Sequence, residues 1–297
     1  MKNTIIILII LVLIGGGIYY FTRSTATAPG NEMATTTVTS TTPTQEYEVI
    51  GQSVSGRDIL AYRFGAGEKE VVFVGALHGG YEWNSALLSY ELIDYFKANP
   101  TAIPVGVRVA IIPVANPDGL AVVVGTSSRF AAADAPQFDF ADEVKFSDPV
   151  VASRFNQNGV DLNRNFDCEW QPKAVWRDYQ TKAGSAAFSE PEAKALRDFL
   201  LAEQPVSVIF YHSASNGVYT SFCGEADPLV GTVSLLSTYA TASGYPRYDV
   251  YPYYEVTGDA ADWLSTQGIP AITVELSTHE SIDWNRNLAG VKAILAR

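Results

Sequence analysis

Two of the three histidines in the chain end apolar runs that are typical of buried strands. His78 ends VVFVGALH and His212 ends SVIFYH, while a third run, AITVEL, carries Glu275 near its end. Glu82 follows His78 by four residues. Two imidazoles and one carboxylate with an open fourth position are the ligand set of catalytic zinc, which polarises a carbonyl and activates a bound water. A lone histidine at a strand end is more often structural, but this combination indicates a hydrolytic metal site.

Strand-like and helix-like patterns alternate along the chain and would bring these residues together. The predicted elements are a β-hairpin over 47–64, buried strands over 71–77, 107–114, 206–211 and 271–276, and helices over 83–98, 190–203 with Ser189 as N-cap, and 282–296. The alternation predicts a single-domain α/β fold in which helices flank both faces of a mixed, mainly parallel twisted sheet. In such sheets, sites form beyond the carboxyl ends of the strands.

Five short motifs point to one family. They are LHGGYEW, ANPDG from Ala115, GVDLNRNFD from Gly159, YHSAS from Tyr211 and ITVEL from Ile272. In this order they resemble the zinc carboxypeptidase superfamily, the carboxypeptidase A-like metallopeptidases, over residues 46–297. The resemblance implies the carboxypeptidase-like fold, one Zn²⁺ per chain, and hydrolysis of peptides that end in a free C-terminal carboxylate.

The resemblance also gives roles to the residues of the metal site. It makes His78, Glu82 and His212 the zinc ligands, and it makes Glu275 the general base. A carboxylate beside zinc can take a proton from the activated water and hand it to the leaving amine.

Four further residues match substrate-binding positions of the family, and one more competes with them. Asn163 and Arg164 match the pair that grips the terminal carboxylate, for which a planar guanidinium fork is well suited. Arg154 matches the arginine that stabilises the oxyanion of the scissile carbonyl, and Arg129 in SSRF is the rival for this role. Tyr254 matches the mobile tyrosine that covers the bound substrate.

One motif departs from the family pattern. The family has two residues between its first histidine and the glutamate, whereas three, Gly79, Gly80 and Tyr81, separate His78 from Glu82. Glycine tolerates backbone angles that other residues avoid, so the two glycines could absorb the extra residue. The departure puts the zinc affinity in doubt.

The stretch TGDAADW corresponds to the family's pocket for the C-terminal side chain. It carries Asp259 beside two small alanines. An acid in this pocket would favour a basic group such as lysine, arginine or the amine of diaminopimelate in cell-wall peptides. Alternatively, Asp259 caps the helix that begins there. The sequence leaves both readings open.

The N-terminal part is expected to lie apart from the catalytic domain. Residues 4–21 are apolar after the first and approach the ~20 residues that a helix needs to cross a bilayer. We expect residues 1–21 to be a membrane anchor or a cleaved signal, 22–45 a flexible Thr/Ser/Pro-rich stalk, and 46–297 the catalytic domain. The domain would then work outside the cytoplasm, anchored or secreted, and would need no removal of a propeptide.

Charge and cysteine content limit the partners. A net charge of −12 over 297 residues argues against nucleic acid, and a monomer is expected. Cys168 and Cys223 could form one disulfide in an oxidising compartment, but their spacing does not show whether they meet.

Two alternatives to a carboxypeptidase remain open. One is a zinc amidohydrolase of the same fold that acts on small acyl-amino acids. The other is a non-catalytic surface protein that binds peptide C-termini, although such a binder has no need of a base at Glu275.

Overall fold

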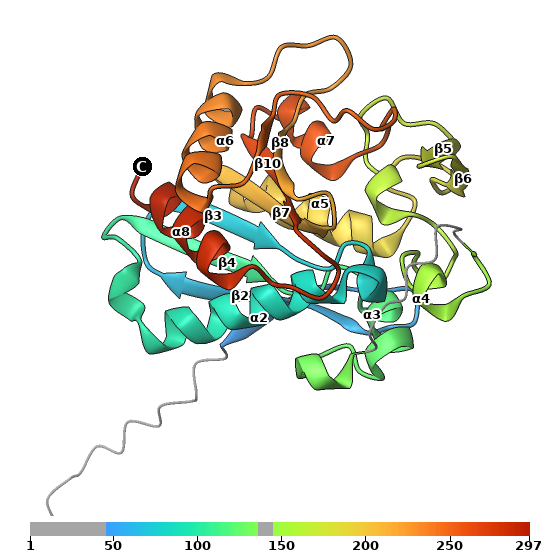
Figure 1. Cartoon of the computed structure of the whole chain (residues 1–297), viewed down its shortest axis with the longest axis horizontal. Helices are drawn as coiled ribbons and strands as arrows, with labels where there is room; N and C mark the ends of the chain where they lie inside the picture. The colour runs from blue at the N-terminus through green and yellow to red at the C-terminus, as the bar shows by residue number, and fades with distance from the viewer. Residues whose placement is uncertain (1–45, 136–144) are drawn as a thin grey trace, which may run out of the picture. The chain divides into compact units, whose positions relative to one another are not determined.

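The computed structural model describes residues 46–135 and 145–297 (Figure 1). The predicted anchor over 1–21 and the stalk over 22–45 lie outside the described residues. Within the described residues, no helix combines the length and the apolar character that crossing a membrane requires.

An eight-stranded mixed sheet forms the centre of the domain. In spatial order its strands are β1 (Tyr47–Gln52), β2 (Asp58–Gly65), β4 (Val107–Ile112), β3 (Lys69–Val74), β7 (Ser207–Ser213), β10 (Ala271–Leu276), β8 (Gly217–Thr220) and β9 (Arg247–Tyr248). The four central strands β4, β3, β7 and β10 run parallel, while β2 and β8 pair antiparallel with the strands that flank this group. The predicted mixed, mainly parallel sheet is therefore confirmed.

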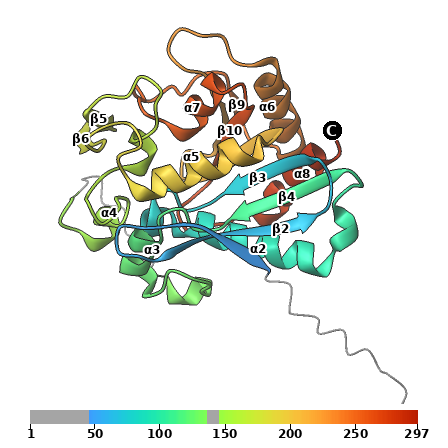
Figure 2. The same ribbon diagram turned by 180° about the vertical axis from the view of Figure 1, so that it is seen from behind.

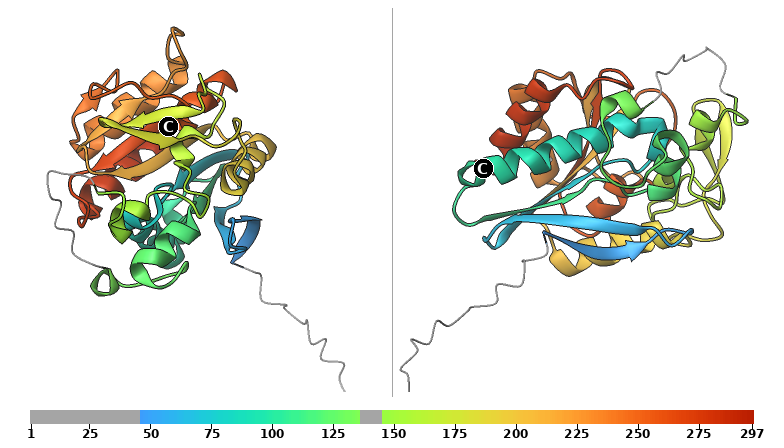
Figure 3. Two further views of the ribbon diagram at one scale, coloured as in Figure 1. Left: turned by 90° about the vertical axis from the view of Figure 1, so that its right-hand side faces the viewer. Right: turned by 90° about the horizontal axis from the view of Figure 1, so that it is seen from below.

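Helices cover both faces of the sheet (Figures 1 and 2). One face carries α2 (Trp83–Ala98), α6 (Val230–Ser243) and α8 (Trp284–Leu295), and the other carries α5 (Pro191–Glu203) and α7 (Ala260–Thr266). Figure 3 (right) shows α2 and α5 on opposite sides of the β1–β2 ribbon.

Shorter elements gather where β3 and β4 end (Figure 2). They are α3 (Pro117–Val124), α4 (Pro149–Ala152) and a separate hairpin of β5 (Lys173–Trp176) and β6 (Tyr179–Lys182). Four 3-10 turns complete the described chain: η1 (Gly79–Glu82), η2 (Pro100–Ala102), η3 (Ala132–Asp134) and η4 (Leu162–Arg164).

The apolar runs of the sequence are explained by burial on both faces. In β3, Val71 and Phe73 belong to the core under α2, whereas Val72 and Val74 belong to the core under α5. A strand covered on both sides has no position for a charged side chain along its middle. Polar residues of the central strands are therefore located at the strand ends, where the candidate site residues lie.

The start of α5 differs from the prediction. Glu190, not Ser189, is the N-cap residue of this helix. The Ser189 hydroxyl instead donates to Glu190 Oε1 and accepts hydrogen bonds from Asn165 Nδ2 and the Ser185 N–H. These tertiary partners take the hydroxyl away from the helix end.

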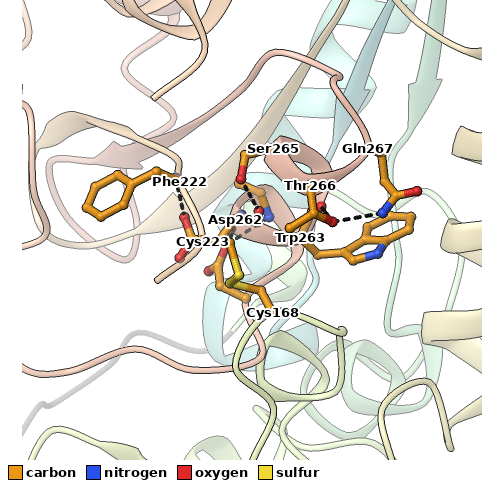
Figure 4. The surroundings of a disulfide bond; sticks show 10 residues. Cys168, Phe222, Cys223, Asp262, Trp263, Ser265, Thr266 and Gln267 are labelled. Carbon is orange, nitrogen blue, oxygen red and sulfur yellow. Dashed lines mark hydrogen bonds between the residues drawn. A yellow bond between two sulfur atoms is a disulfide. The ribbon is translucent and has the colours of Figure 1, made fainter. Parts of the chain in front are cut away.

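Cys168 and Cys223 form a disulfide, which answers the question that their spacing left open. The bond joins the loop after η4 to the loop after β8, next to the start of α7 (Figure 4). Beside it, the Phe222 N–H donates to Asp262 Oδ1 over 3.1 Å. Stable disulfides are typical of exported proteins, the class that the N-terminal segment predicts.

Replacement of both cysteines by serine should destabilise the domain. The bond closes a loop over a separation of 55 residues, and the entropy that such a loop removes from the unfolded chain is worth up to about 4 kcal/mol. Chemical denaturation of the double variant should show this loss, and reduced wild-type protein should match it. Equal stability of the oxidised wild type and the variant would contradict the expectation.

Candidate active site

Three elements bring the predicted metal ligands to the same edge of the sheet. His212 lies within the last residues of β7, and the parallel register of β7 and β10 sets Glu275 directly beside it. His78 follows β3 by four residues, and Glu82 closes the 3-10 turn η1. All three candidate ligands are buried.

Their ligand atoms converge on one point. His78 Nδ1 lies 2.7 Å from Glu82 Oε1, His212 Nδ1 lies 2.8 Å from Glu82 Oε2, and the two ring nitrogens are 3.0 Å apart. Tetrahedral zinc, with bonds of about 2.0–2.1 Å, separates its ligand atoms by roughly 3.3 Å. The three donors therefore fit a zinc ion after small outward movements, and the predicted ligand set comes together.

The extra residue between His78 and Glu82 is absorbed by the two glycines. Gly79 has a φ of 50°, in the left-handed region that glycine tolerates, and a Cβ there would lie 2.6 Å from Ser153 O. A Cβ on Gly80 would lie 2.5 Å from Val123 Cγ2. Only the absence of side chains lets η1 pack this closely and return Glu82 to His78.

Glu82 is ionised in spite of its burial. Burial alone raises the pKa of its carboxyl, but the adjacent imidazoles of His78 and His212 more than offset this and hold the pKa below its usual range. The same carboxylate raises the pKa of His212 against the opposing effect of burial. A buried anion held between two imidazoles is the electrostatic environment that a divalent cation requires.

Asp161 is a further site residue that the roles derived from the sequence did not include. Its Oδ1 lies 3.3 Å from His78 Nε2, and its Oδ2 accepts a hydrogen bond of 2.9 Å from Arg154 Nε. A carboxylate behind a ligating imidazole fixes the orientation of the ring. The motif GVDLNRN contained the signal, because this aspartate stands two residues before Asn163.

The structure separates the two arginines proposed for the oxyanion. Arg154 is 97% buried, lines the cavity and lies with its guanidinium carbon 4.4 Å from the Trp176 ring centroid. Arg129 is exposed, pairs with Asp94 over 2.6 Å and does not line the cavity. The geometry therefore favours Arg154.

Asn163 and Arg164 lie side by side on η4. Asn163 Nδ2 donates to Asp259 Oδ2 over 2.6 Å. Arg164 donates from Nε to Val175 O and from Nη1 to Asn163 O. Both of these acceptors are neutral carbonyls, and no carboxylate of the described residues lies within ion-pair distance of Arg164. Its positive charge is thus available to a ligand.

Asp259 serves as the helix cap that was one of its two predicted roles. Its Oδ1 accepts hydrogen bonds from the Ala261 and Asp262 N–H groups at the start of α7. It also borders the cavity, so the two readings are compatible. Tyr254 lies nearby, with its ring centroid 6.0 Å from the guanidinium carbon of Arg164.

A cavity of about 910 Å³ joins these groups. Its lining includes every site residue that the sequence favoured: His78, Glu82, Arg154, Asn163, Arg164, His212, Tyr254, Asp259 and Glu275. Tyr81, Trp176 and His279 form an aromatic wall of the same cavity, with Tyr81 edge-on to both rings at 5.1 and 4.8 Å.

Glu275 faces the metal site with a pKa suited to proton transfer. Burial and the nearby Glu82 charge raise the pKa of its carboxyl to about 7, against the opposing effect of His212. The Ser215 N–H donates to Glu275 Oε2 over 3.1 Å, which leaves Oε1 free of that bond. A carboxylate with a pKa near neutrality can both accept and return a proton.

Comparison with known proteins identifies related sequences. A family model described as zinc carboxypeptidase matches residues 32–287. Gamma-D-glutamyl-L-diamino acid endopeptidase 1 of Lysinibacillus sphaericus is 26% identical over 249 residues, which are 77% of this chain and 60% of that protein. The catalytic chain of human carboxypeptidase N is 32% identical over 130 residues, 39% of this chain and 25% of that protein. The chain thus spans less than two thirds of the length of these relatives.

Solved structures share the fold. A murein-tripeptide amidase from Escherichia coli O157 superposes with a TM-score of 0.59 at 22% identity, and the match covers 84% of this chain and 92% of that one. Carboxypeptidase A from Helicoverpa armigera superposes with a TM-score of 0.57 at 20% identity over 84% of this chain and 68% of that one.

Substitution of Gly79 by alanine should weaken metal binding. The new Cβ would meet Ser153 O at 2.6 Å and displace η1, with its ligand Glu82. We expect zinc affinity to fall by on the order of tenfold, as is usual when a ligand's support is lost, in a titration against a zinc-binding dye. Gly268→Ala is the matched control, since Gly268 has a φ of 73° but no atom near its Cβ position. The same zinc affinity in both variants would refute the role of Gly79.

Proposed function

Because this chain belongs to the zinc carboxypeptidase family, we propose that it is a zinc-dependent metallopeptidase that releases the C-terminal residue of peptides. One observation carries the proposal: a buried His–Glu–His donor set, a carboxylate poised as a base and an arginine without a carboxylate partner all line one cavity. The first two groups suit hydrolysis, and the third suits a free C-terminal carboxylate.

In this proposal, His78, Glu82 and His212 hold the ion through Nδ1, a carboxylate oxygen and Nδ1. When bound, zinc polarises the scissile carbonyl and activates a water. Asp161 keeps the His78 ring oriented from behind. Three protein ligands beside a cavity are the arrangement in which such an ion would also bind water or substrate.

The remaining steps belong to residues of this chain. Glu275 accepts the proton of the attacking water and delivers it to the leaving amine. Arg154 stabilises the negative charge that develops on the carbonyl oxygen, and its guanidinium is held in place by Asp161 and Trp176. Arg164 binds the terminal carboxylate, and Tyr254 closes over it.

Replacement of Glu275 by glutamine tests the function directly. The amide keeps the shape of the side chain but cannot take a proton, so we expect the variant to retain about one zinc per chain and to lose at least about 100-fold in kcat. The wild type should release residues from free-acid peptides and leave amidated ones intact.

Three outcomes would count against this function. The variant could keep its activity, or the wild type could cleave amidated and free-acid peptides equally well. Hydrolysis of acyl-amino acids in place of peptides would indicate an amidohydrolase of the same fold.

We further propose that the pocket prefers a C-terminal residue whose side chain carries an amine, as lysine and the diamino acids of cell-wall peptides do. Asp259 and Asp262 border the same end of the cavity. Burial and the Asp259 charge raise the pKa of Asp262 well above its usual range, so this carboxyl resists ionisation while no cation is near. A substrate ammonium would favour its ionised form and would bind between the two acids. The Lysinibacillus relative is named as a gamma-D-glutamyl-L-diamino acid endopeptidase, which supports this choice.

Asp262→Asn should shift the preference of the pocket. Asparagine can still accept the hydrogen bond from the Phe222 N–H, so the fold is maintained, but it cannot ionise beside a substrate ammonium. We expect the ratio of kcat/KM for C-terminal lysine over C-terminal leucine to fall by about tenfold or more. Glu91→Gln, on the exposed side of α2, is the control for a change of net charge. A ratio that Asp262→Asn leaves unchanged would rule out this recognition.

A further inference from the structure

A second arginine in the cavity also has no carboxylate partner among the residues that the structure describes. Arg177 forms the tip of the β5–β6 hairpin and lines the cavity. Its guanidinium carbon lies 5.6 Å from the Trp176 ring centroid, and no carboxylate oxygen of the described residues lies within ion-pair distance. Arg154, by contrast, is neutralised by Asp161. Within the described part of the chain, the cavity thus offers two guanidinium groups that have no carboxylate partner, those of Arg164 and Arg177.

The backbone at Arg177 is unusual for this residue type. The β5–β6 turn has only two residues between paired Trp176 and Tyr179, and Arg177 occupies the first with a φ of 54°. Glycine and asparagine are the residues that normally fill such a position. An arginine is retained there at a cost in stability, and such strain is concentrated at functional sites.

The two guanidinium groups lie against different parts of the cavity lining, Arg164 near the Tyr254 ring and Arg177 near the Trp176 ring. Arg164 is next to Asn163, which bonds Asp259 at the end of the cavity proposed for the released residue. Arg177 lies on the aromatic wall, where its charge helps lower the pKa of His279 to about 4, after burial as the main cause. Tyr81 of this wall lies in η1, between the candidate ligands His78 and Glu82, and its ring contacts His279. If the released residue occupies the Asp259 end, Arg177 on the aromatic wall is the guanidinium left for the part of the substrate that precedes the scissile bond.

We propose that Arg177 binds a second carboxylate of the substrate, carried by the residue immediately before the one that is released. This inference rests on the proposed function and specifies its substrate class: peptides with an acidic group at that residue. The group is either the side chain of an α-linked aspartate or glutamate, or the free α-carboxylate of a γ-linked glutamate. Both present the same planar anion to the guanidinium fork.

The test compares matched peptides that differ only in this carboxylate. One pair places glutamate or glutamine, α-linked, before the C-terminal residue that the wild type releases best. The other pair has γ-linked glutamate with its α-carboxylate either free or amidated. The wild type should prefer the acid in at least one pair by about tenfold in kcat/KM at low salt, and less at 1 M salt because the exposed charge is screened. The pair with the larger preference identifies the source of the carboxylate.

Arg177→Gly removes the charge while glycine suits the turn. It should abolish the preference for the acid by lowering kcat/KM on the acid peptides more than on the amide peptides, and it should maintain or raise the melting temperature. Arg197→Ala is the matched control, because Arg197 also lies over an aromatic ring, that of Phe188 at 5.1 Å, but outside the cavity. It should keep the preference of the wild type.

Direct binding separates this inference from the proposed function. The same peptides are titrated into Glu275→Gln, with and without Arg177→Gly. Binding that is about tenfold tighter for the acid peptides and that depends on Arg177 supports the inference. It does so even if no peptide is cleaved, because the absence of cleavage contradicts only the proposed function. Cleavage without any preference for the acid, or an equal loss on acid and amide peptides in Arg177→Gly, overturns the inference and leaves the function in place.

Discussion

The arrangement of the site depends on one buried anion. Glu82 is buried away from water, and the imidazoles of His78 and His212, with Arg154 Nη1 at 3.8 Å, keep its carboxylate charged. A buried charge without partners costs several kcal/mol, so the loop that carries Glu82 has to end between the two rings. This requirement explains why the loop contains two glycines packed against backbone and Val123, with no room for a Cβ. What matters is that the Glu82 carboxylate ends between the two imidazoles. The additional residue between His78 and Glu82 does not prevent this.

A second carboxylate links the metal site to the substrate groups. Asp161 contacts His78 with one oxygen and Arg154 with the other, and its backbone begins the turn that presents Asn163 and Arg164. The pKa of Asp161 is held below its usual range, because Arg154 and His78 outweigh the effect of burial. In the proposed mechanism, one short turn would therefore fix the orientation of a metal ligand, the position of the oxyanion arginine and the groups that bind the terminal carboxylate. A shift of this turn would disturb all three functions together.

The sequence predicts an element correctly where its local pattern agrees with its burial in the fold. It fails where contacts with residues far along the chain determine the local structure. Apolar runs covered on both faces predicted the central strands, and the residues at their ends, His212 and Glu275, met as expected. The N-cap of α5 was predicted wrongly because Asn165, from another loop, binds the Ser189 hydroxyl. The helix α6 was not predicted, since its serines, threonines and β-branched residues favour no helix on their own; packing against α8 stabilises it. The disulfide could not be predicted, because the sequence separation of the two cysteines does not show that their loops lie next to one another.

The β5–β6 hairpin shows how an element outside the sheet can govern the chemistry inside the cavity. The Val175 carbonyl of the hairpin accepts a hydrogen bond from Arg164 Nε. The Trp176 ring packs against the guanidinium of Arg154. Both arginines are long, flexible side chains that would lose much entropy if substrate alone had to order them. Contact with the hairpin orders them in advance, so that more of the interaction with a carboxylate or an oxyanion is available for binding and catalysis. The hairpin thus belongs to the active site, although none of its residues is a proposed metal ligand or base.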